Sequence, residues 1–236
     1  METANETLVF VHGSGDSAQV WAPLIHLLPQ YRSIALDLPG HGALIAEPGS
    51  ATMSVSEYAA FVQAELTRHR LTNPTLIGHS LGGAIALQLA LEAPSAVGRI
   101  VLVGSGARLR VAPAFLQDAS RAGPQGVPTI TRMSFAEDHV VQADAYQAGR
   151  VPTAPGVLHR DLAACDRFDV MAEVERITQP TLLVVGAGDR MTPPKYAEYL
   201  HARLPNSALV VIPDAGHYAQ IEQPQAVADA LRAWLA

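Results

Sequence analysis

The chain has 236 residues, of which 49% are hydrophobic and 16% charged, and this is enough apolar sequence to bury one sizeable core. Sixteen basic and twenty-two acidic residues give a formal net charge of −6 without long runs of one sign, which argues against a nucleic-acid-binding surface. The single cysteine, Cys165, excludes an internal disulfide and a cysteine-based zinc site, and we expect neither a metal nor a cofactor.

The amino-terminal residues 1–7 are polar and lead directly into a strand pattern, which leaves no room for a signal peptide. No apolar stretch reaches the ~18 to 20 residues that a membrane-spanning helix needs. These features predict a cytoplasmic protein that binds neither membranes nor nucleic acids. The sequence leaves open whether the protein is a monomer or a homodimer.

Short apolar, β-branched runs alternate with amphipathic segments along most of the chain. Continuous apolar runs without polar alternation indicate parallel strands that are buried on both faces. The predicted strands span residues 8–11, 33–37, 75–77, 100–103, 181–185 and 209–212. The predicted helices span residues 20–29, 54–69, 83–92, 194–203 and 223–235, and Ser54 with Glu57 forms a capping signal. This alternation predicts a doubly wound α/β fold whose ligand site lies at the carboxyl ends of the strands.

The alternation stops between Gly104 and Phe168. Several Pro and Gly residues there separate short amphipathic pieces at 114–122, 138–148 and 157–165. A connection of this length inside a compact domain is either disordered or a functional lid, and its apolar content favours a folded helical lid. We therefore expect an α/β core of residues 1–106 and 168–236, with a helical cap inserted at 107–167.

The segment Gly78-His79-Ser80-Leu81-Gly82 lies between a predicted strand and a predicted helix, which is the context of a nucleophile elbow. Strand and helix pass closely at such a turn, so the positions two before and two after its tip must nearly lack side chains. Gly78 and Gly82 meet this demand. Free N–H groups at the start of the helix favour a developing negative charge. The segment predicts that Ser80 is a catalytic nucleophile.

An activated serine needs a base and an acid that orients the base, and loops that follow two other predicted strands offer both. His217 comes after the last strand, at the same sheet edge as Ser80, and we predict that it is the base. Asp189 comes after the fifth strand and is predicted to orient His217. Asp214 is a rival, but its closeness to His217 in sequence disfavours a well-aligned bond between the side chains.

A turn of small residues, His12-Gly13-Ser14-Gly15, ends the first predicted strand. Glycines at such a turn let backbone N–H groups face the cleft, so we expect the N–H groups of Ser14 and Leu81 to form the oxyanion hole. The predicted substrate pocket takes residues from the cap and from the sheet edge: Phe115, Leu116, Met133, Val140, Tyr146, His79, Met191 and Tyr218.

Five segments spread along the chain carry a family resemblance: VFVHG at 9–13, DLPGHG at 37–42, IGHSLGG at 77–83, VGAGD at 185–189 and AGHY at 215–218. Together they resemble the α/β-hydrolase superfamily, specifically the small capped bacterial hydrolases related to esterases, enol-lactonases, carbon–carbon bond hydrolases and cofactor-free haloperoxidases. The resemblance implies Ser80 as nucleophile, Asp189 as orienting acid and His217 as base, with Ser14 and Leu81 at the oxyanion hole. Most relatives begin with an antiparallel hairpin for which this chain has no room, so we expect a shortened, mainly parallel sheet of about six strands.

These residues predict a serine hydrolase that cleaves a small carboxylic ester through a Ser-His-Asp triad and an acyl-enzyme intermediate. A lactone or a carbon–carbon bond is an alternative target for the same triad. A non-catalytic, ligand-binding protein is the alternative outside enzymes, although a pure binder has no need for all three groups. Dehalogenase and epoxide hydrolase chemistry is disfavoured, because related enzymes of those classes need an aspartate at the position of Ser80.

Overall fold

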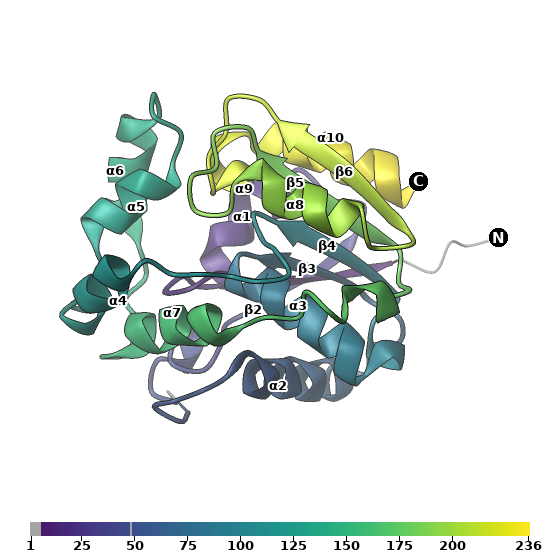
Figure 1. Ribbon diagram of the computed structural model, residues 1–236, viewed down its shortest axis with the longest axis horizontal. Helices are drawn as coiled ribbons and strands as arrows, with labels where there is room; N and C mark the ends of the chain where they lie inside the picture. The colour runs from purple at the N-terminus through teal and green to yellow at the C-terminus, as the bar shows by residue number, and fades with distance from the viewer. Residues whose placement is uncertain (1–5, 48) are drawn as a thin grey trace.

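The computed structural model describes residues 6–47 and 49–236. Its centre is a six-stranded, fully parallel sheet with the strand order β2-β1-β3-β4-β5-β6 (Figure 1). The strands are β1 (Thr7–Val11), β2 (Arg32–Leu36), β3 (Thr75–His79), β4 (Arg99–Val103), β5 (Thr181–Gly186) and β6 (Ser207–Ile212). The chain runs outward from β1 to β2 and then builds the other side of the sheet from β3 onward. The predicted doubly wound fold is confirmed, and the strand order reverses between β1 and β3.

The central strands are buried on both faces, which explains their continuous apolar sequences. Every residue of β3 and β5 is buried, as expected for parallel strands covered by helices. The register pairs Val11 of β1 with Gly78 of β3, and His79 of β3 with Val103 of β4. The loops that follow these three strands therefore begin at the same edge of the sheet, at the point where the strand order reverses.

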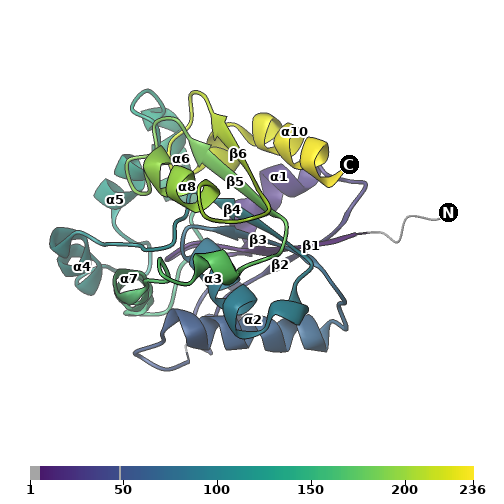
Figure 2. The ribbon, with the colours of Figure 1, turned by 45° about the vertical axis from the view of Figure 1, so that its right-hand side comes forward.

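Helices cover both faces of the sheet (Figures 1 and 2). The helices α2 (Val55–Arg68), α3 (Leu81–Glu92) and α8 (Pro194–His201) pack on one face. The helices α1 (Ala22–His26), α9 (Ala219–Glu222) and α10 (Pro224–Leu235) pack on the other. Side chains of β1 alternate between the two layers, because Val9 belongs to the first hydrophobic cluster and Phe10 to the second. Short 3-10 turns lie in the connections between these elements: η1 (Ala18–Trp21), η2 (Gly42–Leu44), η3 (Pro94–Ala96) and η4 (Val174–Arg176).

The prediction of one continuous helix at 20–29 is wrong. The structure has the 3-10 turn η1 followed by the five-residue helix α1, with Pro23 in the first turn of α1. Proline lacks an N–H and fits only the first turn of a helix, so it divides the segment into two short pieces. The capping signal of α2 is confirmed, because Glu57 N–H donates to Ser54 Oγ and Ser54 N–H donates to the Glu57 carboxylate.

Four helices lie between β4 and β5, in the segment 107–167 that we call the cap: α4 (Pro113–Ser120), α5 (Pro128–Ser134), α6 (Val140–Gly149) and α7 (Val157–Arg167). The helix α5 has no counterpart among the predicted pieces. Helix α4 packs against α7, and α5 against α6, over the carboxyl ends of the strands (Figure 1). In the ranges that the structure describes, no helix is both long and apolar enough to cross a bilayer.

Candidate active site

Ser80 is the single residue between β3 and α3, and its backbone is held in a strained turn. Its φ of 52° lies in the left-handed region, which residues other than glycine rarely adopt. The Ser80 N–H donates to the Val103 carbonyl at 3.0 Å. The Ser80 carbonyl accepts bonds from the N–H groups of Gly83 and Ala84 and from the Ser105 hydroxyl, at 3.0, 3.1 and 2.9 Å. These four bonds fix the residue at the tip of the turn.

Gly78 and Gly82 let three backbone segments meet at this turn. A Cβ on Gly78 would overlap the backbone of Gly82, and a Cβ on Gly82 would overlap the carbonyl of Val11 at the end of β1. The loop after β1 also approaches closely, since a Cβ on Gly13 would lie 3.3 Å from Ser80 Cβ. The small residues therefore place the loop after β1 directly beside Ser80.

His217 and Asp189 form a hydrogen-bonded pair whose side chains are both nearly inaccessible to solvent. His217 Nδ1 lies 2.9 Å from Asp189 Oδ2. The N–H groups of Met191 and Thr192 donate to Asp189 Oδ1 at 2.8 Å each, and Thr192 Oγ1 donates to Oδ2 at 2.8 Å. Burial disfavours the charged carboxylate, but His217 and the Thr192 donors lower the pKa of Asp189 below its usual value. An ionised Asp189 holds the proton on His217 Nδ1 and leaves Nε2 to face other groups.

Ser80 and His217 line the same cavity. Among the described residues, no hydrogen bond joins Ser80 Oγ to His217, and bonds of this kind often tighten only when substrate binds. Room for the His217 ring comes from Gly104 at the end of β4, where a Cβ would lie 3.0 Å from His217 Nδ1 and 3.3 Å from Asp189 Oδ2. The absence of a side chain at Gly104 therefore leaves space at the sheet edge for the His217–Asp189 pair.

Two backbone N–H groups near Ser80 have no hydrogen-bond acceptor among the described residues. Leu81 is the first residue of α3, and a first helical residue has no intrahelical acceptor for its N–H. Ser14 follows β1 and lines the cavity. Neither N–H donates a hydrogen bond to another described residue. Both donors are therefore available to an oxygen atom bound beside Ser80.

The cavity has a volume of about 210 Å³ and lies between the sheet edge and the cap. Apolar side chains of the cap form one wall: Val111, Phe115, Val127, Ile130, Leu158 and Leu162. Polar groups gather at the sheet edge: Ser14, Asp16, His79, Ser80 and His217. A mostly apolar cleft with a few convergent polar groups is typical of a site for a small organic ligand.

The predicted pocket residues divide into two groups. His79, Phe115, Met191 and Tyr218 line the cavity. Leu116, Met133, Val140 and Tyr146 do not line it: Met133 and Val140 are exposed, Leu116 packs inside the cap, and Tyr146 faces a neighbouring cavity. The cap helices are short, so the sequence pattern does not settle which of their apolar residues turn inward.

Sequence reasoning missed two groups that shape the site. Asp16 has a side chain that is 1% exposed, accepts hydrogen bonds from the hydroxyls of Tyr146 and Tyr218, and lies 3.8 Å from Arg150 Nη2. Burial raises the pKa of Asp16 above its usual value, and these neighbours oppose the rise. The second group is Thr192, whose position three residues after Asp189 is a turn signal that could have been noticed. Nothing in the sequence around Asp16 distinguishes it from a solvated loop residue.

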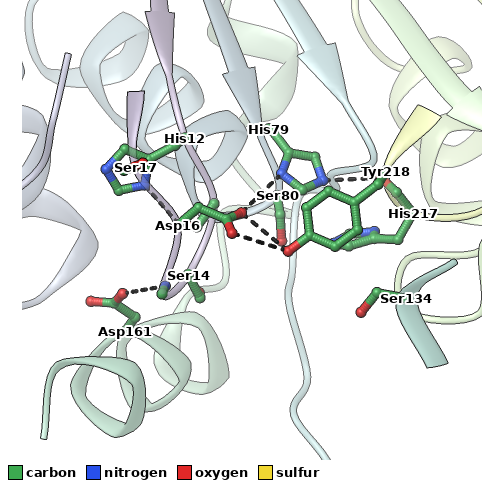
Figure 3. A network of polar contacts seen from close by, with 12 residues as sticks. His12, Ser14, Asp16, Ser17, His79, Ser80, Ser134, Asp161, His217 and Tyr218 are labelled. Atoms are coloured by element: carbon green, nitrogen blue, oxygen red, sulfur yellow. Dashed lines mark hydrogen bonds and ion pairs between the residues drawn. The ribbon is translucent and has the colours of Figure 1, made fainter. Parts of the chain in front are cut away.

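His79 ties the elbow to the loop that carries His217 (Figure 3). Its Nε2 donates to the His217 carbonyl at 3.0 Å, and its Nδ1 lies 3.9 Å from Asp16 Oδ2. Burial and the nearby His217 ring lower the pKa of His79 well below its usual value. The ring is therefore neutral and acts as a brace between two loops of the site.

Comparisons with known proteins identify the family of the chain. The model of the alpha/beta hydrolase family matches residues 8–230. A pimeloyl-[acyl-carrier protein] methyl ester esterase from Neisseria meningitidis serogroup A is 32% identical over an alignment of 253 positions that covers 97% of this chain and 76% of that protein. A lipase-esterase related protein from Clostridium acetobutylicum has a TM-score of 0.85 at 26% identity, with 99% of this chain and 96% of that chain covered. A thermophilic esterase has a TM-score of 0.78 at 34% identity, with 97% and 88% covered. The chain therefore belongs to the alpha/beta hydrolase family, as a carboxylic ester hydrolase.

Proposed function

We propose that the protein hydrolyses esters through a serine ester intermediate, with Ser80 as nucleophile, His217 as base and Asp189 as orienting acid. The 2.9 Å bond between His217 Nδ1 and Asp189 Oδ2, in the cavity that Ser80 lines, is the observation that carries the proposal. His217 takes the Ser80 proton while Ser80 Oγ attacks the ester carbonyl, and the protonated ring then donates that proton to the leaving alcohol. Water repeats the attack on the acyl-enzyme, which releases the acid and restores Ser80.

Negative charge develops on the carbonyl oxygen in both attacks. We assign its stabilisation to the N–H groups of Ser14 and Leu81, because Leu81 directly follows Ser80, Ser14 lines the same cavity, and neither N–H has a protein acceptor among the described residues. Such donors are already in place before the reaction and need no reorganisation. The oxyanion hole then comes from the ends of two neighbouring strands, β1 and β3.

We further propose that the substrate is an ester of a small alcohol whose acyl part lies against the apolar wall of the cap. The relative from Neisseria meningitidis is named for a substrate that is the methyl ester of a pimeloyl chain. In this protein, the side chains of Val127, Ile130 and Leu162 form an apolar surface against which an acyl chain can pack. A lactone is an internal ester and is the alternative substrate for the same groups.

Turnover of p-nitrophenyl acetate tests the assignment of Ser80. Ser80→Ala should lower kcat about 10³-fold or more, because the covalent intermediate cannot form. Ser134→Ala is the matched control, since Ser134 lines the same cavity but its hydroxyl donates within its own helix, to the Ile130 carbonyl at 2.8 Å, and to no other residue that the structure describes. A fluorophosphonate should label the parent and Ser134→Ala but not Ser80→Ala. Equal rates in Ser80→Ala and the parent would overturn the proposal.

The substrate class is tested separately, with kcat/KM values for a panel of methyl esters of increasing acyl length, matching lactones and vinylogous diketones. We expect the methyl esters to be the best substrates, with kcat/KM rising as the acyl chain lengthens across the apolar wall. A lactone or diketone that exceeds every ester would reassign the substrate while leaving the role of Ser80 intact.

A further inference from the structure

Gly15, the residue directly after Ser14, is held on both sides by residues of the cap. Its N–H donates to Asp161 Oδ2 of α7 at 2.9 Å, and its carbonyl accepts a hydrogen bond from Arg150 Nη2, just after α6. The φ of Gly15 is 69°, and a Cβ there would lie 2.8 Å from Leu158 Cδ1 and 2.9 Å from Arg150 Nη2. The cap therefore closes directly on this glycine, whose positive φ favours a residue without a side chain.

Asp161 joins the cap to three separate parts of the core. Besides Gly15 N–H, it accepts a bond from His41 Nε2 at 2.8 Å and one from the Tyr58 hydroxyl at 2.5 Å. His41 follows β2 and Tyr58 lies on α2. The Asp161 side chain is 0% exposed, and Figure 3 shows it pointing from its helix toward the loop that carries Ser14. One carboxylate thus fixes α7 against two loops and a helix.

The bonds to Asp161 also decide its charge. Burial alone would raise the pKa of Asp161, but His41 and the Tyr58 hydroxyl lower the pKa below its usual value. A buried carboxylate is costly unless several donors surround it, so the position of Asp161 is tightly specified by its partners. Asp161 is not among the residues that line the catalytic cavity, and it has no part in the proton transfers proposed above.

We propose that Asp161 is a positioning residue for the oxyanion hole. By holding Gly15 N–H it fixes the plane of the Ser14–Gly15 peptide, and only the φ and ψ rotations of Ser14 then remain between that plane and the Ser14 N–H. The Ser14 donor is correctly aimed only when the cap is seated on the core. The inference rests on the proposed function, because it takes the Ser14 N–H to be an oxyanion donor.

The test is a pair of substitutions that remove different amounts of this support, Asp161→Ala and Asp161→Asn. Misplacing a reacting group by about 1 Å can cost about 10²-fold, so Asp161→Ala should lower kcat for p-nitrophenyl acetate about 10- to 100-fold with KM changed less than about threefold. The inhibition constant of a boronic acid, whose tetrahedral adduct places an oxygen in the hole, should rise by the same factor as kcat/KM falls. Asp161→Asn keeps an oxygen acceptor for Gly15 N–H, so its kcat should fall by only about three- to tenfold.

Tyr58→Phe is the matched control for stability. It removes a hydrogen bond from the same carboxylate but leaves the bond to Gly15 in place, so kcat should stay within about twofold of the parent even where the melting temperature falls. Rates are expressed per fluorophosphonate-titrated site, below the unfolding temperature of each variant. The inference is overturned if Asp161→Ala keeps the parent kcat, or if Tyr58→Phe loses as much kcat as Asp161→Ala.

Three further outcomes are decided by the Asp161 variants together with Ser80→Ala. If Asp161→Ala does not fold, Asp161→Asn decides the question, and an unchanged kcat and boronate affinity in that variant overturn the inference. Equal rates in Ser80→Ala and the parent overturn the proposed function and this inference with it. An inactive Ser80→Ala together with the parent kcat in Asp161→Ala overturns this inference alone.

Discussion

The pKa values of two neighbouring histidines are shifted in opposite directions because their hydrogen-bond partners differ. The rings of His12 and His41 lie 4.7 Å apart, and both side chains are buried. His12 Nδ1 contacts the Gly13 carbonyl at 2.8 Å, and its Nε2 accepts the Leu38 N–H at 3.0 Å, an arrangement that only the neutral ring can make. Burial and the nearby His41 lower the pKa of His12 to about 3. Burial also acts against a charged His41, yet the carboxylate of Asp161 raises its pKa above the usual value.

The neutral state of His12 predicts a loss of stability in mild acid. The pKa of His12 is about 3 in the folded protein and about 6.5 in the unfolded chain. Between these pH values His12 is protonated in the unfolded chain but not in the folded protein. The contribution of His12 is therefore complete above pH 6.5 and is lost, at about 1.4 kcal/mol per pH unit, as the pH falls toward 3. Urea unfolding between pH 7 and 5 measures the slope.

His12→Gln should make that slope shallower by about 1 kcal/mol per pH unit, since it removes the titrating group. The exposed His26 provides the matched control, and His26→Gln should leave the slope of the parent unchanged. An equal slope in His12→Gln and the parent would show that His12 binds protons alike in the folded and unfolded states, which contradicts a lowered pKa.

At the scale of elements, the site depends on close passage between β1, β3 and α3. Gly82→Ala would place a Cβ against the Val11 carbonyl, and relieving that overlap requires α3 to move away from β1. We expect a loss of about 1 to 3 kcal/mol in unfolding free energy and a lower kcat, because Ser80 lies on the same turn. Gly149→Ala at the end of α6 is the control, since a Cβ there meets nothing within 4 Å. Gly149→Ala should be neutral or stabilise by up to about 1 kcal/mol, and equal stability of the two variants would contradict the argument.

The parts of the fold that depend on local pattern were predictable from the sequence. Buried parallel strands have continuous apolar sequences, and α2 begins at a capping signal between Ser54 and Glu57, so both kinds of element were found. The turn around Ser80 was predicted because its backbone geometry demands glycines at fixed spacing. The sequence also places Asp189 and His217 on loops at one sheet edge, where their side chains lie 2.9 Å apart; their catalytic roles stay predictions.

The parts that depend on tertiary contacts were not predictable. Helix α5 was missed, and Met133 and Val140 face solvent rather than the cavity, because short helices carry too few turns for a pattern to define the inner face. Asp161 has no sequence signal at all, since its partners at positions 15, 41 and 58 are far away along the chain. A buried charge looks like a surface charge until its donors are known.

At the scale of the whole molecule, the core and the cap are stabilised differently. Large hydrophobic clusters cover both faces of the sheet, whereas a small cluster formed by Ala119, Leu158 and Leu162 holds the cap together. Polar contacts also join the cap to the core, among them the bonds of Asp161 and a 2.8 Å contact between His139 and Glu222. They add to apolar contacts, because Cys165 and Phe135 of the cap belong to the two large clusters of the core. The catalytic cavity lies between these two units.

This difference predicts a gradient of local stability across the cap. Helices α4 and α6 each bury a single residue, Ala119 and Ala143, whereas α7 buries seven of its eleven residues, with Asp161 among them. Segments with few buried contacts open more readily, so the amides of α4 and α6 should exchange with deuterium well before those of α7. The amides of α7 should exchange nearly as slowly as those of β3 and β5.

In Asp161→Asn, the exchange rate of the α7 amides should rise toward that of α4, while β3 and β5 keep their parent rates. Mass spectrometry of deuterium uptake checks this order, and uniform exchange across α4, α6 and α7 in the parent would contradict a seating of the cap through α7.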